Sequence, residues 1–341
     1  MLTEKQYQQI KEELDNCKNP LFFFDDDPDG LCAFLLLYRY IKEGHGFVVK
    51  THPKLDIRSA PKIEQFEADK VFVLDVALVD QDFIDACKVP LIWVDHHGPY
   101  ERSNVKYFNP RLAKKDGNIP TTYMCYKVVN HDLWIAMLGC IADYYMPDFV
   151  DEFKKAYPDL MNDEKEVDEI YFNTKLGSLI KIFAFSLKGK TSDVMKNMKI
   201  LTRIESPYEI LNKETSKGRF IFKHYEKINK IYDELLEEGI NQATDEKLLV
   251  FIYPDDKMSL TGELANELLY KFPDKVIIVG RTKNEEVKMS IRSKKIQIPL
   301  ILEKALAGLE GYGGGHEFAC GANVNVNDFK EFVKRIRKSV S

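Results

Sequence analysis

Three short apolar segments near the start of this chain each run directly into carboxylate or imidazole side chains. The segments are residues 21–24, 71–74 and 91–94, and the side chains that follow them begin at Asp25, Asp75 and Asp95. Amphipathic stretches separate the segments, a pattern that predicts an α/β domain with a mostly parallel sheet. Because the carboxyl ends of parallel strands share the edge where open α/β sheets bind ligands, we expect these side chains to meet in one site.

The pattern divides the chain into three parts. Residues 1–150 are expected to form the larger α/β domain, residues 151–245 a helical connector, and residues 246–341 a smaller α/β domain. The expected strands are 21–24, 47–50, 71–74, 91–94, 248–253, 276–280 and 287–293. The expected helices are 31–42, 81–88 with Asp80 as N-cap, 120–130, 133–144, 225–238, 260–271 and 300–309.

Composition limits the class of protein. The net charge of −5 excludes a broadly basic surface of the kind that coats long duplexes. A local basic groove and bound metal ions can still hold a short strand. The six cysteines are scattered without a C-x-x-C pair, so we expect buried free thiols. No apolar run approaches the roughly 18 residues of a membrane span, and we expect a cytoplasmic protein.

Carboxylates and one imidazole at separate strand or helix ends are expected to converge as metal ligands. They are Asp27, Asp29, Asp75, His96 and Asp143. Close packing of four carboxylates is strongly unfavourable unless cations neutralise them, so we expect two ions, Mn²⁺ with Mg²⁺ as the alternative. Taken singly, these residues also fit a solvated loop, a helix cap or packed imidazoles. Their fixed order along the chain favours the metal site.

A glycine-rich segment near the C-terminus predicts an anion site. Gly313, Gly314 and Gly315 let backbone amides approach an anion closely, and His316 adds a donor. Arg292, in an expected strand with Ser290, suits a phosphate or a base. Taken alone, the glycine run also fits a flexible loop, and Arg292 a surface charge.

These motifs resemble those of the DHH phosphoesterases that carry a DHHA1 second domain. The four DHH motifs resemble residues 25–30, Asp75, residues 95–97 and residues 139–143, and residues 313–321 have the fixed positions of the family's G-G-G-H-x-x-A-x-G. The resemblance implies one Mn²⁺ on Asp27 and Asp75. It implies a second Mn²⁺ on Asp29, Asp75, His96 and Asp143.

The resemblance also assigns roles around the metals. It implies that His97 contacts the scissile phosphate and that Asp95 orients an imidazole. Many members have a histidine where this chain has Phe23, so either Asp25 or water would complete the first metal site. The remaining residues implied to bind the nucleotide are Ser290, Arg292, Gly313, Gly314, Gly315 and His316.

The function implied is that of a RecJ-like exonuclease or nanoRNase, a Mn²⁺-dependent hydrolase that converts short single-stranded RNA or DNA to mononucleotides. One alternative is a phosphodiesterase for cyclic or linear dinucleotides such as pApA. Another is a non-catalytic replication scaffold, although scaffolds of this fold have eroded metal motifs. A homodimer is one assembly that the sequence leaves open.

Overall fold

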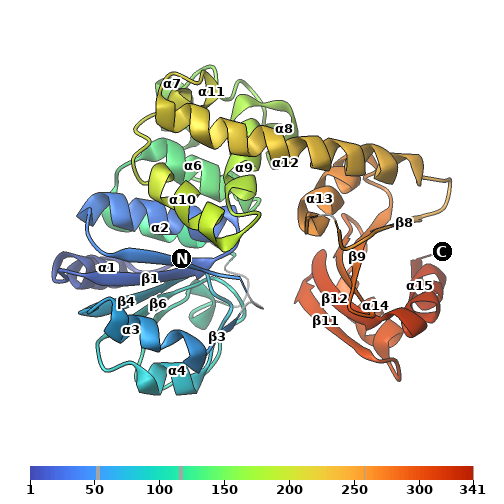
Figure 1. Cartoon of the computed structure of the whole chain (residues 1–341), viewed down its shortest axis with the longest axis horizontal. Helices are drawn as coiled ribbons and strands as arrows, with labels where there is room; N and C mark the ends of the chain where they lie inside the picture. The colour runs from blue at the N-terminus through green and yellow to red at the C-terminus, as the bar shows by residue number, and fades with distance from the viewer. Residues whose placement is uncertain (51–53, 115–117, 257, 341) are drawn as a thin grey trace. The chain divides into compact units, whose positions relative to one another are not determined.

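The computed structural model describes residues 1–50, 54–114, 118–256 and 258–340. The chain forms two compact units, Met1–His224 and Tyr225–Ser341 (Figure 1). Helix α12 (Ser216–Asn241) begins in the first unit and ends in the second. Within the described ranges, no helix is both long and apolar enough to cross a membrane. The domain limits at residues 150 and 245 remain a prediction.

A parallel five-stranded sheet forms the centre of the first unit, in the order β2-β1-β4-β6-β7. Its strands are β1 (Pro20–Asp25), β2 (His45–Val49), β4 (Lys70–Leu74), β6 (Leu91–Val94) and β7 (Lys106–Phe108). A short pair beside it consists of β3 (Lys54–Leu55) and β5 (Leu78–Val79). The strand order reverses between β1 and β4, so their carboxyl ends flank the position where such sheets bind ligands.

Helices cover both faces of this sheet, which explains why its strands are continuously apolar. The helices of the first unit before α12 are α1 (Glu4–Asp15), α2 (Pro28–Ile41), α3 (Pro61–Gln65), α4 (Gln81–Ala86), α5 (Thr121–Val129), α6 (Leu133–Ala142), α7 (Val150–Ala156), α8 (Val167–Asn173), α9 (Lys175–Ser186), α10 (Thr191–Leu201) and α11 (Pro207–Leu211), with 3₁₀ turns η1 (Ile57–Ser59) and η2 (Pro110–Leu112); not all of them touch the sheet, since α11 packs on α9. On one face Phe24 stacks on Phe34 of α2, with ring centroids 4.6 Å apart. On the other face Phe23 meets Phe83 of α4 edge-on at 5.6 Å.

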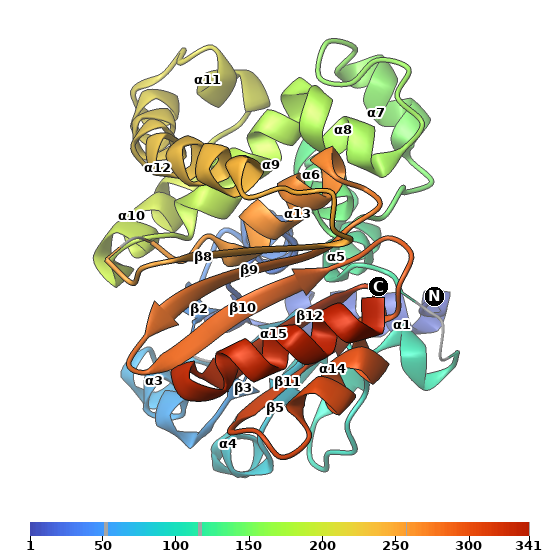
Figure 2. The ribbon, with the colours of Figure 1, turned by 90° about the vertical axis from the view of Figure 1, so that its right-hand side faces the viewer.

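The second unit contains a mixed five-stranded sheet in the order β11-β12-β10-β9-β8. Its elements are β8 (Leu248–Tyr253), α13 (Thr261–Lys271), β9 (Val276–Lys283), β10 (Glu286–Arg292), α14 (Ile298–Leu306), β11 (Gly311–His316), β12 (Ala319–Asn325) and α15 (Val326–Val340). Only the β8–β9 pair is parallel among the described strands of this sheet. Figure 2 shows α14 and α15 over one face, where Leu302 and Phe332 join Met289 in a buried core.

The predicted α/β fold class is confirmed, while several element limits differ. The glycine-rich segment forms edge strand β11, and the short strand β7 lacked a recognisable sequence pattern. The helix predicted at 225–238 is the middle of the longer α12. Asp80 occupies the N-cap of α4, but its side chain caps no amide because it pairs with Lys54 at 2.6 Å.

Candidate functional site

Two aspartates of the candidate centre are fixed at the amino end of α2. Asp27 is the N-cap of this helix, and its Oδ1 accepts a hydrogen bond from the Gly30 amide at 2.9 Å. Asp29 lies in the first turn and is buried. Position 30 requires glycine, because a Cβ atom there would lie 2.7 Å from the Asp25 amide nitrogen. The tight turn after β1 therefore keeps Asp25, Asp27 and Asp29 close together.

The first turn of α5 supplies hydrogen-bond donors to two carboxylates. The amides of Thr121 and Thr122 donate to Asp29 at 2.9 and 2.7 Å, an arrangement that the positive end of a helix favours. The Thr121 hydroxyl donates to Asp75 Oδ1 at 3.0 Å. Asp75 follows β4 with a φ of 62°, a left-handed conformation that is uncommon outside glycine. Such strain is concentrated at functional sites.

His96 is oriented by a hydrogen-bond chain. Its Nε2 lies 3.3 Å from Asp75 Oδ1 and 4.0 Å from Asp29 Oδ2, and its Nδ1 lies 3.1 Å from Asn118 Oδ1. Arg111 donates to the same Asn118 atom at 3.1 Å, which identifies that atom as the amide oxygen. An oxygen acceptor selects the tautomer with its proton on Nδ1. The Nε2 lone pair is then directed toward the carboxylates.

A different carboxylate holds His97. Its Nδ1 lies 2.8 Å from Oδ1 of the buried Asp95, whose other oxygen accepts from Asn109 Nδ2 at 3.2 Å. Burial is the largest influence on the pKa of His97 and would lower it. The hydrogen bond and charge of Asp95, with the charges of Asp25 and Asp143, outweigh burial and raise the pKa to about 9. The Asp95 carboxylate therefore favours the protonated form of this imidazole.

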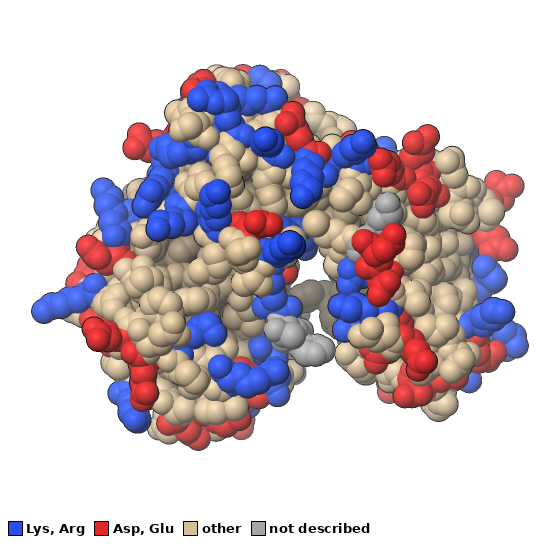
Figure 3. Space-filling view, in the orientation of Figure 1, with Lys and Arg blue, Asp and Glu red and all other residues tan. Residues whose placement is uncertain are grey.

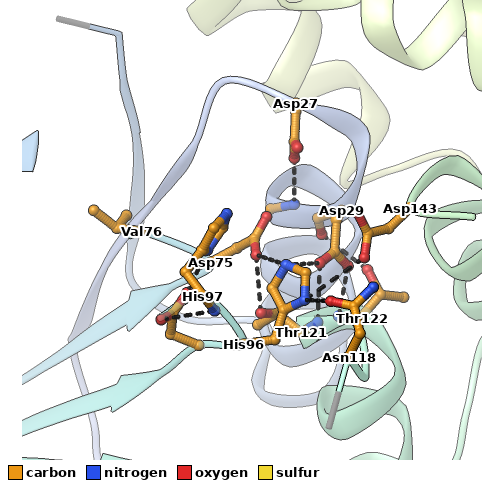
Figure 4. Close-up of polar contacts among 12 residues, drawn as sticks. Asp27, Asp29, Asp75, Val76, His96, His97, Asn118, Thr121, Thr122 and Asp143 are labelled. Atoms are coloured by element: carbon orange, nitrogen blue, oxygen red, sulfur yellow. Dashed lines mark hydrogen bonds and ion pairs between the residues drawn. The ribbon is translucent and has the colours of Figure 1, made fainter. Parts of the chain in front are cut away.

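The aspartates and histidines bring their ligand atoms together in three overlapping groups (Figure 4). The groups are Asp75 with His96 and His97, Asp25 with Asp27 and Asp75, and Asp29 with His96 and Asp143. Within each group the ligand atoms all lie within 4.8 Å of one another. Asp75 and His96 each belong to two groups, and of the two only the carboxylate of Asp75 has two oxygens with which to bind two ions.

The chemistry of this cluster fits a divalent metal. Asp143 Oδ2 is buried and accepts no hydrogen bond within the described residues, although it lies 3.7 Å from His96 Nδ1. Buried carboxylate oxygens ordinarily have partners, so an atom of this kind facing other acidic side chains indicates a cation. Carboxylate oxygens combined with an imidazole nitrogen are a donor set suited to Mn²⁺.

Electrostatics support the same interpretation. The pKa of Asp25 is raised to about 8 and that of Asp27 to about 6, in both cases by burial first and then by a neighbouring aspartate. The same causes raise the pKa of Asp75 and Asp143 well above the usual value. Burial lowers the pKa of His96. The protein alone therefore disfavours the ionised carboxylates, and bound cations would compensate them.

Position 23 does not supply a ligand. Phe23 is 2% exposed and lies in the core between the sheet and α4. Asp25 is two residues further along β1 and faces the same side. Its carboxylate reaches the group that contains Asp27 and Asp75. Of the two alternatives that the sequence left open, this geometry favours Asp25 over water.

The residues implied to bind the nucleotide lie in the second unit. Strand register pairs Ala319 of β12 with Arg292 on one side and His316 on the other. Two rows further along, Gly321 pairs with Ser290 and Gly314. Residues in one row, and residues two apart on a strand, point to the same face. We define the open sheet face as the face that carries Ser290, Arg292, Gly314 and His316.

The three consecutive glycines differ in whether the surrounding structure would tolerate a side chain. Gly313 faces α14, where a Cβ atom would lie 2.9 Å from Gly321 O and 3.0 Å from Leu302 Cδ2. Gly315 has a φ of 148° and a similarly close backbone contact. A Cβ at Gly314 would have no neighbouring atom within 4 Å. Packing therefore requires glycine at 313 and 315, whereas Gly314 leaves the open sheet face accessible.

Polar contacts hold Arg292 and Ser290 beside α13. Arg292 Nε donates to Asn266 Oδ1 at 2.7 Å, and its Nη1 donates to Cys320 O at 3.3 Å. The Ser290 hydroxyl donates to Thr261 Oγ1 at 3.1 Å. The guanidinium therefore has a fixed position at the border between α13 and the open sheet face.

Sequence reasoning missed the residues that orient the ligands. Pro120 followed by two threonines indicated a helix start, but their bonds to Asp29 and Asp75 require the folded chain. Asn118 and Arg111 lie between predicted elements and have no local pattern that marks them. Their signal is tertiary, because they meet His96 only in the fold.

Two regions of the chain match known domain families. Residues 21–160 match the DHH family, N-terminal domain, and residues 245–341 match the DHHA1 domain. Together these matches cover most of the chain. No curated protein sequence matches it.

Solved structures share the fold at low sequence identity. RecJ from Thermus thermophilus in complex with Mn²⁺ is 16% identical with a TM-score of 0.69, over 98% of this chain and 54% of that chain. A manganese-bound exonuclease RecJ is 15% identical with a TM-score of 0.62, over 98% and 93%. The DHH domain of a member of a ribosomal protein family is 14% identical with a TM-score of 0.68, over 98% and 89%. This chain thus spans about half of the Thermus RecJ chain.

Proposed function

Since this chain belongs to the DHH family of metal-dependent phosphoesterases and carries a DHHA1 domain, we propose that it hydrolyses short single-stranded RNA or DNA to mononucleotides. One observation carries the proposal. Asp75 is grouped with Asp25 and Asp27 and lies 3.3 Å from His96, which is grouped with Asp29 and Asp143, so it stands between two sets of ligand atoms, as a two-metal phosphodiesterase requires. The intact cluster also argues against a non-catalytic scaffold.

The proposed metal ligands combine these groups, and Asp75 joins the group of Asp29, His96 and Asp143 through its 3.3 Å approach to His96. Asp25, Asp27 and Asp75 would hold one ion, and Asp29, Asp75, His96 and Asp143 the other, with Mn²⁺ favoured over Mg²⁺ by the imidazole. Ions bound there would stabilise negative charge on the phosphate and lower the pKa of water.

The chain's own side chains would position the substrate. Asp95 fixes the ring of His97, and the protonated form of this ring would donate to a non-bridging phosphate oxygen as negative charge develops there. Thr121 and Thr122 hold the acidic ligands in place, so little reorganisation is needed during the reaction. Arg292 and His316 on the open sheet face would bind the terminal nucleotide. A cytoplasmic location and a homodimer stay predictions.

A substrate-length series tests this function. End-labelled RNA and DNA of 2 to 30 nucleotides are incubated with Mn²⁺ or Mg²⁺ in parallel, and products are separated by size. We expect mononucleotides from short strands of several lengths, with higher turnover in Mn²⁺. Hydrolysis of dinucleotides with no turnover of a 10-mer would favour the dinucleotide phosphodiesterase instead. Absence of turnover at every length would contradict the proposal that this chain hydrolyses nucleic acid.

A further inference from the structure

The first unit has a recess beside strand β2, at the side edge of the sheet. The cavity has a volume of about 380 Å³ and is lined by residues of β1, β2, β3, η1, α3 and α10. We call this cavity the edge pocket. Figure 3 shows a hollow between α3 and α10 with lysine and arginine side chains around it. A cavity of this size falls within the range of small-ligand sites.

The edge pocket is basic although the whole chain is acidic. Four cations line it, Lys50, Lys54, Arg58 and Lys62, against one carboxylate, Asp56. Arg58 pairs with Asp56 at 2.5 Å, and Lys54 pairs with a second carboxylate at 2.6 Å.

The other two cations contact neutral groups. Lys50 Nζ donates to the carbonyl of Leu187 at 2.8 Å, and Lys62 Nζ lies 5.6 Å from the ring centroid of Phe47. Neither contact neutralises the ammonium charge. The pocket therefore has a net positive charge of the kind that attracts a phosphate.

One end of the edge pocket reaches the carboxyl end of β2, next to the acidic cluster. Val49, the last residue of β2, pairs in register with Asp25 at the end of β1. Lys50 follows directly, and the charge of Asp26 acts on its ammonium group. A strand of nucleic acid that reaches the metal ligands would therefore pass close to Lys50 at the rim of the edge pocket.

The wall of the edge pocket is apolar. Phe47 and Val49 of β2 and Val194 and Met195 of α10 line it. Phe47 is half-buried, with Lys62 over its ring, so a base would stack on it only by displacing the Lys62 side chain; stacking of a base on an aromatic ring is a common element of single-strand binding. Positive charge next to an aromatic surface is the combination that such sites share.

We propose that the edge pocket binds a nucleotide of the single-stranded substrate next to the scissile bond, with its phosphate facing Arg58 and Lys62. This assignment rests on the proposed function and adds a second binding region for the strand. An extended protein segment pairing with the free edge of β2 is the competing occupant. The excess of cations favours the nucleic acid.

Charge reversal tests the edge pocket. The variant Arg58→Glu/Lys62→Glu alters two side chains outside the metal cluster, and Lys18→Glu/Lys88→Glu is a control with the same change in net charge at exposed positions. With Mn²⁺ and a ten-nucleotide single strand, we expect the pocket variant to raise KM at least tenfold with kcat within threefold. The salt dependence of KM should also become shallower, because phosphate contacts are lost. The control should keep both parameters.

A second variant separates occupancy of the pocket from its charge. Ser59→Trp fills the cavity without changing charge and should also raise KM, with thermal melting used to confirm that each variant is folded. If KM stays at the wild-type value in both pocket variants, nucleotide binding in the edge pocket is refuted while the proposed function stands. A protein segment would then be the occupant of the pocket. A fall in kcat at unchanged KM would also refute nucleotide binding in the edge pocket. If the wild-type protein does not hydrolyse the strand, the proposed function and the pocket fall together.

Discussion

The acidic cluster of the first unit and the open sheet face of the second unit differ in whether the protein itself supplies partners for their polar side chains. In the cluster, buried carboxylates with raised pKa values face one another, and Asp143 Oδ2 has no donor within the described residues. On the open sheet face, Arg292 and Ser290 already have hydrogen-bond partners. The first region thus requires bound cations, whereas the second is complete before substrate binds. Substitutions should accordingly affect metal binding and kcat in one region and KM in the other.

The largest effect is expected for Asp75→Asn. Asparagine keeps the oxygen that accepts from Thr121 and tolerates the left-handed backbone, but it removes the charge that two ions would share. We expect kcat to fall by roughly a thousandfold or more. The melting temperature of the metal-free protein should rise, because a buried like charge is lost. Asp85→Asn, at an exposed position, is the control. Near wild-type turnover of Asp75→Asn would refute the proposed two-metal centre.

Asn118→Ala tests whether hydrogen-bond orientation matters as much as charge. The variant removes the acceptor that fixes the His96 tautomer and leaves every acidic ligand in place. We expect Mn²⁺ affinity to fall by about 10–100-fold, measured by isothermal titration calorimetry. Asn212→Ala, at an exposed position, should bind Mn²⁺ as the wild type does. Unchanged affinity in Asn118→Ala would show that the acidic residues suffice.

The pH dependence of stability distinguishes the cluster from ordinary surface carboxylates. The pKa of Asp25 is about 8 and that of Asp27 about 6 in the folded protein, so the folded state holds protons that the unfolded state has already lost. The free energy of unfolding of the metal-free protein should therefore decrease as pH rises from about 4 to about 8. Saturating Mn²⁺ should reverse the trend. A metal-free stability that increases over this range would contradict the electrostatic account.

Arg292→Ala should separate the two regions kinetically. The guanidinium would contribute binding that is equal in the ground state and the transition state, so we expect KM to rise about tenfold with little change in kcat. Lys304→Ala, at an exposed position on α14 over the opposite face of the sheet, is the control. A fall in kcat at constant KM would place Arg292 in the chemical step instead.

The smallest effects are expected for two adjacent glycines. Gly313→Ala should destabilise the second unit by roughly 1–3 kcal/mol, because the methyl group would overlap a strand carbonyl and Leu302. Gly314→Ala has open space and should keep its melting temperature while raising KM severalfold. Equal melting temperatures for the two variants would contradict the assignment of opposite faces.

Much of the fold was predictable because local patterns carried it. Short apolar segments separated by amphipathic ones predicted the parallel sheet, and four strands of the first unit lie where expected. Edge strands were less predictable. Strand β7 is short, and β11 consists mostly of glycine, so neither has the alternating apolar pattern that marks a strand.

The ligand residues of the candidate site were predictable from the sequence, but the residues that orient them were not. Acidic residues and histidines at strand ends indicated a metal centre, and the fold gathers their ligand atoms. The roles of Asn118 and Arg111 were not predictable, because they depend on a contact with His96 that only the folded chain creates. The edge pocket was hidden for the same reason, since its walls come from segments far apart in the sequence.

The amino-acid sequence by itself determined the fold class, the family and the chemical character of the centre, because apolar periodicity and acidic motifs are local properties of the chain. The tertiary structure decided which residues orient the ligands, which histidine nitrogen faces the acidic residues, and which glycine is open to a ligand. Those choices depend on distances of a few ångströms between residues that are remote in sequence. Only packing of the sheet and its helices sets such distances.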